Sequence, residues 1–238
     1  MLKTKRKIIA GICAAAAVFA VAAALFAADY YNLLPQKAYS AADFGIETVK
    51  SGSDFNRNGT DDYTDIMLGA RSDALNRPKY DGSYFAGGYP PDSTGVCTDV
   101  IWRAFKNAGY SLRDMVDVDI RMRPEAYTRI AEPDSNIDFR RVYNLHVFFE
   151  EYAQSLTTDT TNISDFQPGD IVIFGNDKHI GIVSDRRNKN GRPYIIHNGG
   201  QPVREEDYLK RDTVTAHYRF DAAAVPDDIL KEWRGQTE

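Results

Sequence analysis

The sequence predicts an α+β protein in which a helical half precedes a sheet of short antiparallel strands, with one apolar helix before both. Three observations support this fold class. Apolar residues recur at helical spacing up to about residue 156, short apolar runs alternate with Gly, Asn and Pro turns after residue 167, and a long uncharged run lies close to the N-terminus. With 43% hydrophobic and 12% aromatic residues among 238, the composition is that of a globular protein with a packed core.

The uncharged run covers the 21 residues Ile8–Ala28 and follows a basic tip, residues 1–7, that holds four Lys or Arg. A helix of that length spans a hydrocarbon core of about 30 Å. We expect residues 8–28 to be a single-pass transmembrane signal anchor, with the tip in the cytoplasm and the rest of the chain extracytoplasmic. Secretion after signal cleavage is the alternative, although the run is longer than the apolar region of most signal peptides.

The rest of the chain is acidic. All 34 Asp and Glu follow residue 28, against 25 of the 29 Lys and Arg, so the formal charge beyond the apolar run is 25 − 34, or −9. Nucleic acid binding needs clustered basic side chains, so nucleic acid is excluded as a partner. The two cysteines are Cys13, inside the apolar run, and Cys97. They form no disulfide framework, and Cys97 needs another explanation.

Composition divides the exported part into four segments. Residues 29–53 are expected to be a juxtamembrane linker, residues 54–65 a polar loop, residues 66–221 the main domain and residues 222–238 a C-terminal tail. Within the domain, apolar spacing predicts helices at 66–76, from Cys97 to Gly109, and at 144–156. Strands are expected at 171–174, 179–185, 194–198 and 215–220, separated by turns such as QPGD and NKNGRP.

The loop at 54–65 has the spacing of a twelve-residue calcium loop, with a glycine at position 6 for the sharp turn. The expected oxygen ligands are the side chains of Asp54, Asn56, Asn58, Asp62 and Asp65 and the carbonyl of Thr60. Position 12 is Asp65 instead of the usual bidentate Glu, and in this respect the loop resembles the calcium loops of dockerin-like modules. The alternative is an Asx-rich turn that caps the following helix. We expect structural Ca²⁺ that holds the N-terminal segment against the domain.

Cys97 is expected in the first turn of its helix, capped by Ser93 or Thr94, where the helix dipole favours a thiolate. His179 opens one strand and His197 ends the next, so the two imidazoles lie near each other if these strands are neighbours. A nucleophile, a base and a group that orients the base are the elements of nucleophilic catalysis. The alternative is that Cys97 is a small buried hydrophobe and each histidine a structural residue.

Five motifs occur in a fixed order: GVCTDVIWRAF, PDSNIDFRRVYNL, QPGDIVIF, HIGIVSDRRNKNGRPYIIHNGG and AHYRF. Over about residues 65–221 they closely resemble the bacterial domain-of-unknown-function family 1287, with Phe139 and Tyr143 replacing a His and a Pro of the family pattern. The arrangement also resembles NlpC-type peptidoglycan peptidases of the papain-like superfamily. That resemblance implies a papain-like cysteine hydrolase domain at 66–221, with Cys97 as nucleophile, His179 as base and His197 as third residue.

Asn198 is the reserve candidate for the third role, but in a regular strand its side chain points to the face opposite His197. Asn136, Asp138, Arg140 and Arg141 are further candidates, for substrate binding. An Arg that lines the cleft could clamp a carboxylate of a peptidoglycan stem peptide with two hydrogen bonds. The alternative interpretation of this motif is helix capping and surface ion pairs.

Together with the apolar anchor, the resemblance implies a hydrolase of the bacterial cell membrane that cleaves a peptide or amide bond in peptidoglycan and needs no metal or organic cofactor for catalysis. Two alternatives remain. One is a catalytically idle module that binds the cell wall, and the other is a transpeptidase or acyltransferase that uses the same thiol.

Overall fold

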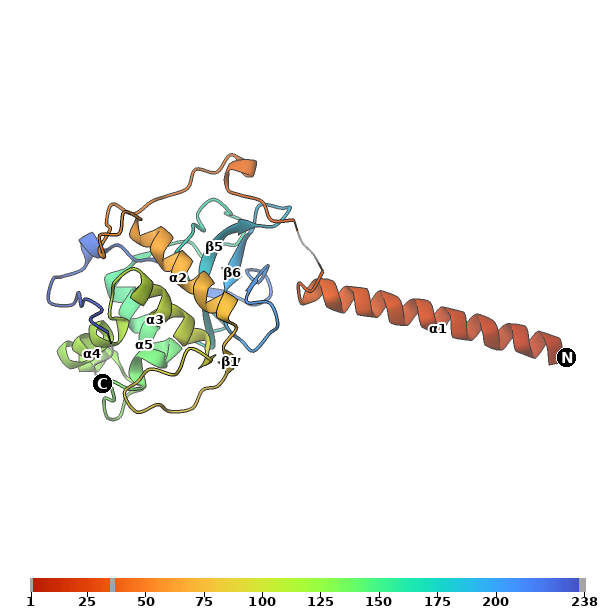
Figure 1. Cartoon of the computed structure of the whole chain (residues 1–238), viewed down its shortest axis with the longest axis horizontal. Helices are drawn as coiled ribbons and strands as arrows, with labels where there is room; N and C mark the ends of the chain where they lie inside the picture. Colours follow the sequence, from red (N-terminus) through yellow and green to blue (C-terminus); the bar gives the residue numbers. More distant parts are fainter. Residues whose placement is uncertain (1, 35–36, 236–238) are drawn as a thin grey trace. The chain divides into compact units, whose positions relative to one another are not determined.

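The computed structural model describes residues 2–34 and 37–235 (Figure 1). The chain forms two compact units, Met1–Gln36 and Lys37–Glu238, which are described separately. Residues 1, 35–36 and 236–238 belong to the predicted tip, linker and tail and lie outside the described residues.

The first unit is one helix, α1, Leu2–Tyr30. The most apolar 18 residues within its Thr4–Tyr30 part have a mean hydropathy of 2.6, and none of them is buried. An Ala-rich helix that is apolar on all sides suits a hydrocarbon surrounding better than the surface of a folded domain. The predicted N-terminal apolar helix is confirmed. By length and composition it is able to serve as a membrane anchor or as a signal sequence.

In the second unit, the described residues 37–235 form four α-helices. They are α2, Asp62–Asn76; α3, Cys97–Asn107; α4, Leu112–Met122; and α5, Val142–Tyr152. Helix α3 forms because its apolar residues fall on one face, and Val100, Ile101, Ala104 and Phe105 are all buried. Short 3₁₀ turns lie at Ala42–Phe44, Pro124–Ala126, Asp138–Arg140 and Ala222–Ala224. Helix α4 was not expected from the sequence.

A six-stranded antiparallel sheet has the order β3-β8-β4-β5-β6-β7. The strands are β3, Gln154–Ser155; β4, Ile171–Phe174; β5, His179–Arg187; β6, Pro193–Ile196; β7, Glu205–Glu206; and β8, Val214–Arg219. The expected antiparallel sheet after the helical half is confirmed. A separate parallel pair, β1 (Lys79–Tyr80) and β2 (Thr94–Gly95), leads directly into α3.

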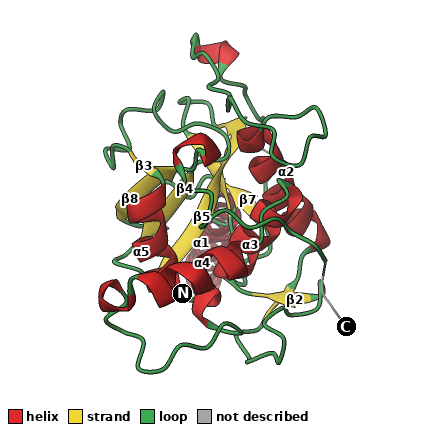
Figure 2. Ribbon diagram, turned by 90° about the vertical axis from the view of Figure 1, so that its left-hand side faces the viewer, coloured by secondary structure: helices red, strands yellow, loops and turns green. Residues whose placement is uncertain are grey.

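The sheet is buried on both faces, which explains why its central strands are continuously apolar. On one face Ile180, Ile182 and Ile196 join the helices in the main core, and α2, α3 and α5 pack there (Figure 2). On the other face Val183 and Ile195 belong to a smaller cluster under the 205–214 segment. The start of α3 and the start of β5 are thereby brought together.

The segments that flank 66–221 pack onto this unit. The backbone of Tyr39 pairs with Arg187 at the end of β5. Phe55 stacks on Tyr110 with 4.2 Å between ring centroids, and Trp233 stacks on Trp102 at 6.2 Å. The compact unit therefore begins at Lys37 and takes in the calcium-type loop and the described part of the tail.

Candidate active site

Cys97 is the first residue of α3, and its side chain is buried. The Val96 N–H that precedes it donates to the carboxylate of Asp99 at 2.7 Å, so Asp99 caps this helix from its third position. The expected cap by Ser93 or Thr94 is wrong, because Thr94 lies in β2 and Asp99 reaches back to the helix start. The expected position of Cys97 in the first turn is confirmed.

The Cys97 thiol faces backbone N–H groups. The N–H groups of Ile180 in β5 and of Thr98 and Cys97 at the helix start lie near the sulfur and favour the thiolate. Burial nevertheless raises the pKa of Cys97 to about 11, and the nearby carboxylate of Asp99 adds to the rise. The expected thiolate is therefore not the resting form, because loss of water outweighs the helix-start donors. At neutral pH the site holds a thiol.

His179 is the neighbour of Ile180, and it contacts His197. The Nε2 atom of His179 lies 2.7 Å from Nδ1 of His197. Antiparallel pairing of Ile182 with Ile196 puts both histidines on one face of β5 and β6, in a diagonal cross-strand position. Burial, with a contribution from His197, lowers the pKa of His179 to about 3. The imidazole is neutral and available as a base.

Behind His197 lies an acidic residue that the sequence analysis missed. Nε2 of His197 is 3.2 Å from Oε1 of Glu206, and Oε2 of Glu206 is 2.5 Å from Arg211. His197 and Glu206 are each only 2% exposed. The only signal in the sequence was an acidic pair, Glu205 and Glu206, a few residues after the strand that ends at His197.

Asn198, the reserve third residue, faces away from His197. Its Nδ2 donates to the carbonyl of Gly95 at 3.0 Å and to that of Pro78. It therefore fastens the strand that leads into Cys97, as expected from strand alternation. Of the two candidates, the structure brings His197 to His179.

The candidate substrate-binding residues do not gather around the thiol as a clamp. Both Nε and Nη2 of Arg140 bind the carboxylate of Asp99, at 2.8 and 3.0 Å, and the Arg140 side chain is 1% exposed. Its guanidinium is thus committed to a buried ion pair that also supports the start of α3. For Arg140 the structure therefore favours a role in an ion pair over a role in substrate binding.

The other three members of that motif differ in exposure. Asp138 is buried and accepts the N–H of Asp134 at 2.7 Å, which closes a local turn. Asn136 is half-buried between Tyr84 and Arg113. Arg141 is exposed, so its guanidinium is the one in this motif that solvent and ligands can reach.

The calcium-type loop is partly assembled. The amides of Asn56 and Asn58 both lie 2.9 Å from Oδ2 of Asp65, and the Asp54 carboxylate accepts the N–H groups of Asn58 and Gly59. Four of the predicted ligands thus converge. Further contacts fix both amides in this orientation, because Asn56 Nδ2 also donates to the Asn107 carbonyl at 2.8 Å and Asn58 Oδ1 accepts the Thr60 N–H at 2.7 Å.

Asp62 takes no part in this cluster. Its carboxylate turns toward the core and accepts hydrogen bonds from the Phe55 N–H at 2.9 Å and the Tyr110 hydroxyl at 2.5 Å. The Thr60 N–H donates to Oδ1 of Asn58 at 2.7 Å. Among the described residues, no cluster of three or more His, Cys, Asp or Glu is arranged to hold a metal ion. Any cation here would rely on the Asn amides.

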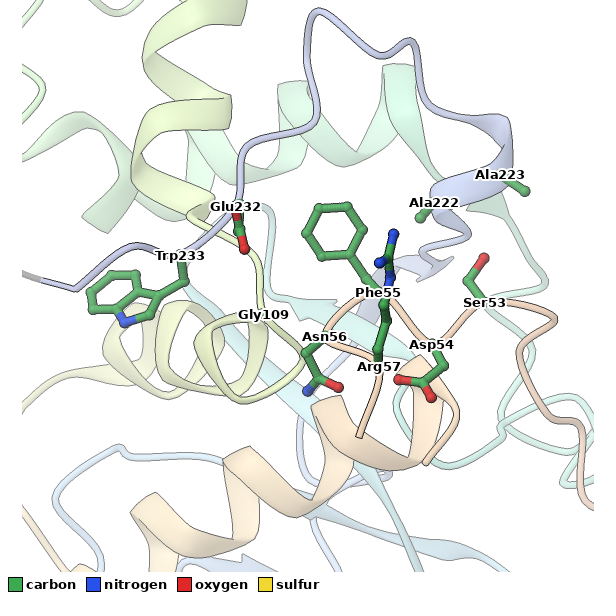
Figure 3. Close-up of a pocket in the computed structure, with 10 residues that line it drawn as sticks. All are labelled: Ser53, Asp54, Phe55, Asn56, Arg57, Gly109, Ala222, Ala223, Glu232 and Trp233. Atoms are coloured by element: carbon green, nitrogen blue, oxygen red, sulfur yellow. The ribbon is translucent and has the colours of Figure 1, made fainter. Parts of the chain in front are cut away.

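A hollow of about 730 Å³ borders this loop (Figure 3). Its wall includes Asp54, Phe55 and Asn56 from the loop and Trp233 from the C-terminal segment. The hollow opens beside the calcium-type loop, whereas Cys97 lies at the junction of α3 and β5. The two features are therefore distinct places on the unit.

The segment that contains these residues is similar to a known protein family. Residues 67–220 match the domain of unknown function DUF1287. The chain belongs to the DUF1287 family. Cys97, His179, His197 and Glu206 all lie inside the DUF1287 segment, whereas α1 and the calcium-type loop precede it.

A relative of this DUF1287 protein is the uncharacterized protein YijF of Escherichia coli (strain K12). It is 38% identical over 165 residues, which cover 65% of this chain and 80% of YijF. No solved structure matches the chain.

Proposed function

We propose that this DUF1287 protein is a cysteine hydrolase that cleaves a peptide or amide bond in peptidoglycan. One observation carries the proposal: the Cys97 thiol lies near the N–H of Ile180, the residue that follows His179 in β5, and Nε2 of His179 lies 2.7 Å from Nδ1 of His197. A nucleophile, a base and an orienting group from three elements are the parts that acyl transfer requires.

The pKa directions favour a general-base route from a neutral pair. His179 takes the Sγ proton as sulfur bonds to the amide carbonyl carbon, and N–H groups at the start of α3 stabilise the oxyanion. The C–N bond then breaks as His179 protonates the leaving amine, which leaves a thioester. Water, deprotonated by His179, attacks the thioester and releases a carboxylic acid and the Cys97 thiol.

The proposal includes a papain-like fold of the NlpC type. A nucleophile that opens a helix, a base that opens a strand and a polar residue at the end of the next strand occur here in that order, at Cys97, His179 and His197. The helix packs on an antiparallel sheet, as in the family that the motifs resemble. This agreement of order and placement supports the superfamily assignment.

We place the domain outside the cytoplasmic membrane, where stem peptides are found. The basic residues before the apolar run and its length support an uncleaved anchor, and removal of α1 as a signal is the alternative. Exposed Arg141 remains available to meet a stem-peptide carboxylate.

The test is to incubate the full chain, in detergent micelles, with purified peptidoglycan and to identify released fragments by mass spectrometry. The control is Cys97→Ala, for which we expect release to fall at least about 10³-fold, as when the nucleophile of a catalytic triad is removed. Wall binding without release by either protein would support an idle binding module. Adducts with an added amine would support a transferase.

We also propose that the loop formed by Asp54, Asn56, Asn58 and Asp65 binds structural Ca²⁺. A weak extracellular-type site with Kd near 10⁻⁴ M, at about 100-fold excess Ca²⁺, would stabilise the unit by about 2.7 kcal/mol. We expect thermal unfolding to shift upward with CaCl₂, and Asp65→Asn to abolish the shift. An equal Tm with and without CaCl₂ would overturn this proposal.

A further inference from the structure

A line of contacts runs from the candidate base into the interior. His179 Nε2 meets His197 Nδ1 at 2.7 Å, His197 Nε2 meets Glu206 Oε1 at 3.2 Å, and Glu206 Oε2 meets Arg211 Nη1 at 2.5 Å. Each ring nitrogen of His197 therefore has its own partner, one toward the thiol site and one toward a carboxylate.

These partners determine which nitrogens carry protons. Arg211 only donates, and its pairing keeps Glu206 a carboxylate that only accepts. Nε2 of His197 must then be the N–H of that ring. Burial lowers the pKa of His197, so the ring holds one proton and Nδ1 is bare. That bare nitrogen accepts the Nε2–H of His179, which leaves Nδ1 of His179 without a proton.

The other groups around His197 do not compete for this assignment. The Gln201 amide nitrogen lies 3.3 Å from Nδ1 and 3.1 Å from Nε2, so it is nearly equidistant from the two ring nitrogens and selects neither of them. It donates instead to the His197 carbonyl at 3.2 Å. The Tyr208 ring packs against the imidazole with centroids 4.3 Å apart, the Arg204 carbonyl accepts the backbone N–H of His197 at 2.9 Å, and the Arg204 side chain contributes a nearby positive charge.

We propose that Glu206 is a positioning residue that, through His197, sets the tautomer of His179 and so leaves Nδ1 of His179 free to accept the Cys97 proton. The inference rests on the proposed role of the Cys97–His179 pair. The proposed catalytic unit then consists of four groups in a line, Cys97, His179, His197 and Glu206. The Glu206 carboxylate determines which nitrogen of each imidazole carries the proton.

Glu206→Gln gives a sharp test because the amide has one donor end and one acceptor end. Arg211 can only donate, so the amide oxygen must face Arg211 and the NH₂ must face His197 Nε2. We expect His197 to move its proton to Nδ1 and His179 to move its proton to its own Nδ1. The base is then blocked with almost no change in shape.

The primary measurement is the ¹⁵N spectrum of the histidine rings in the full chain, which distinguishes the two neutral tautomers. We expect Nε2–H on both His179 and His197 in the wild type and Nδ1–H on both in Glu206→Gln. The matched control is Glu205→Gln, because the adjacent Glu205 binds Arg71 and Ser184 instead of His197. That control should keep the wild-type tautomers.

A proton on Nδ1 of His197 in the wild type would overturn the inference without any variant. Unchanged tautomers in a folded Glu206→Gln protein would also overturn it. If the wild type cleaves peptidoglycan, Glu206→Gln should lower kcat by about 10²–10⁴-fold at similar KM, since a wrong tautomer in a catalytic triad costs about 10⁴-fold. A wild type that cleaves nothing would refute the proposed function and leave the tautomer result standing.

Discussion

Acidification from pH 7 to pH 4 should lower the free energy of unfolding by about 3 kcal/mol through His179 alone. Its pKa falls from the ordinary 6.5 to about 3 in the folded protein. Below pH 6.5 the unfolded chain binds a proton at this residue, whereas the folded protein does not until about pH 3. The stability that depends on neutral His179 is therefore complete above pH 6.5 and is lost progressively as the pH falls toward 3.

The measurement is urea unfolding at pH 7 and pH 4, followed by tryptophan fluorescence, since both tryptophans, Trp102 and Trp233, lie in the second unit. Carboxylates contribute to the same pH range, so the informative quantity is the difference between the wild type and His179→Gln. The variant should lose about 3 kcal/mol less on acidification. An identical loss in both proteins would contradict a half-buried His179 that stays neutral at pH 4.

Arg140→Leu should destabilise the second unit by about 3–5 kcal/mol, the usual result of removing one partner of a buried ion pair. Asp99 is 0% exposed, and its carboxylate would keep the Val96 N–H and the Trp102 indole but lose its countercharge. The carbonyl of Ser83 would also lose the Arg140 donor. Because Asp99 caps α3, this damage would reach the position of Cys97.

Arg141→Leu is the control, since Arg141 is the exposed neighbour of Arg140 and its change should stay within about 0.5 kcal/mol. Urea unfolding at pH 7 gives both values. If the two substitutions cost the same, the Asp99–Arg140 pair does not support the start of α3. Arg140 would then again be a candidate for substrate binding.

Local pattern was sufficient to predict the main elements. The apolar face of α3 and the short apolar runs of β4, β5 and β6 are visible in the sequence, and all four elements are present. Helix α4 was missed although Leu112, Met115, Val116 and Ile120 have helical spacing and are buried. The helix also contains many Asp and Arg residues, so its apolar face is narrow and the helical pattern is weak in the sequence.

The site was predictable only where neighbouring strands bring residues together. His179 and His197 follow from two consecutive strands, whose pairing sequence order already favours. Arg140 pairs with Asp99, 41 residues away, and no local pattern indicates such a partner. Glu206 was missed because β7 has only two residues, and its pairing with β6 depends on the path of the intervening chain.

That short strand makes chain length a part of the site's chemistry. Glu205 pairs across from Ile196 and Glu206 across from Ile195, so the two carboxylates point to opposite faces of the sheet. A slip of one residue between His197 and β7 would present Glu205 to His197 and turn Glu206 toward the surface cluster around Arg71. The length of the segment 198–204 therefore determines which carboxylate faces His197. We expect an insertion in this segment that shifts the register of β7 to be tolerated only when it adds an even number of residues.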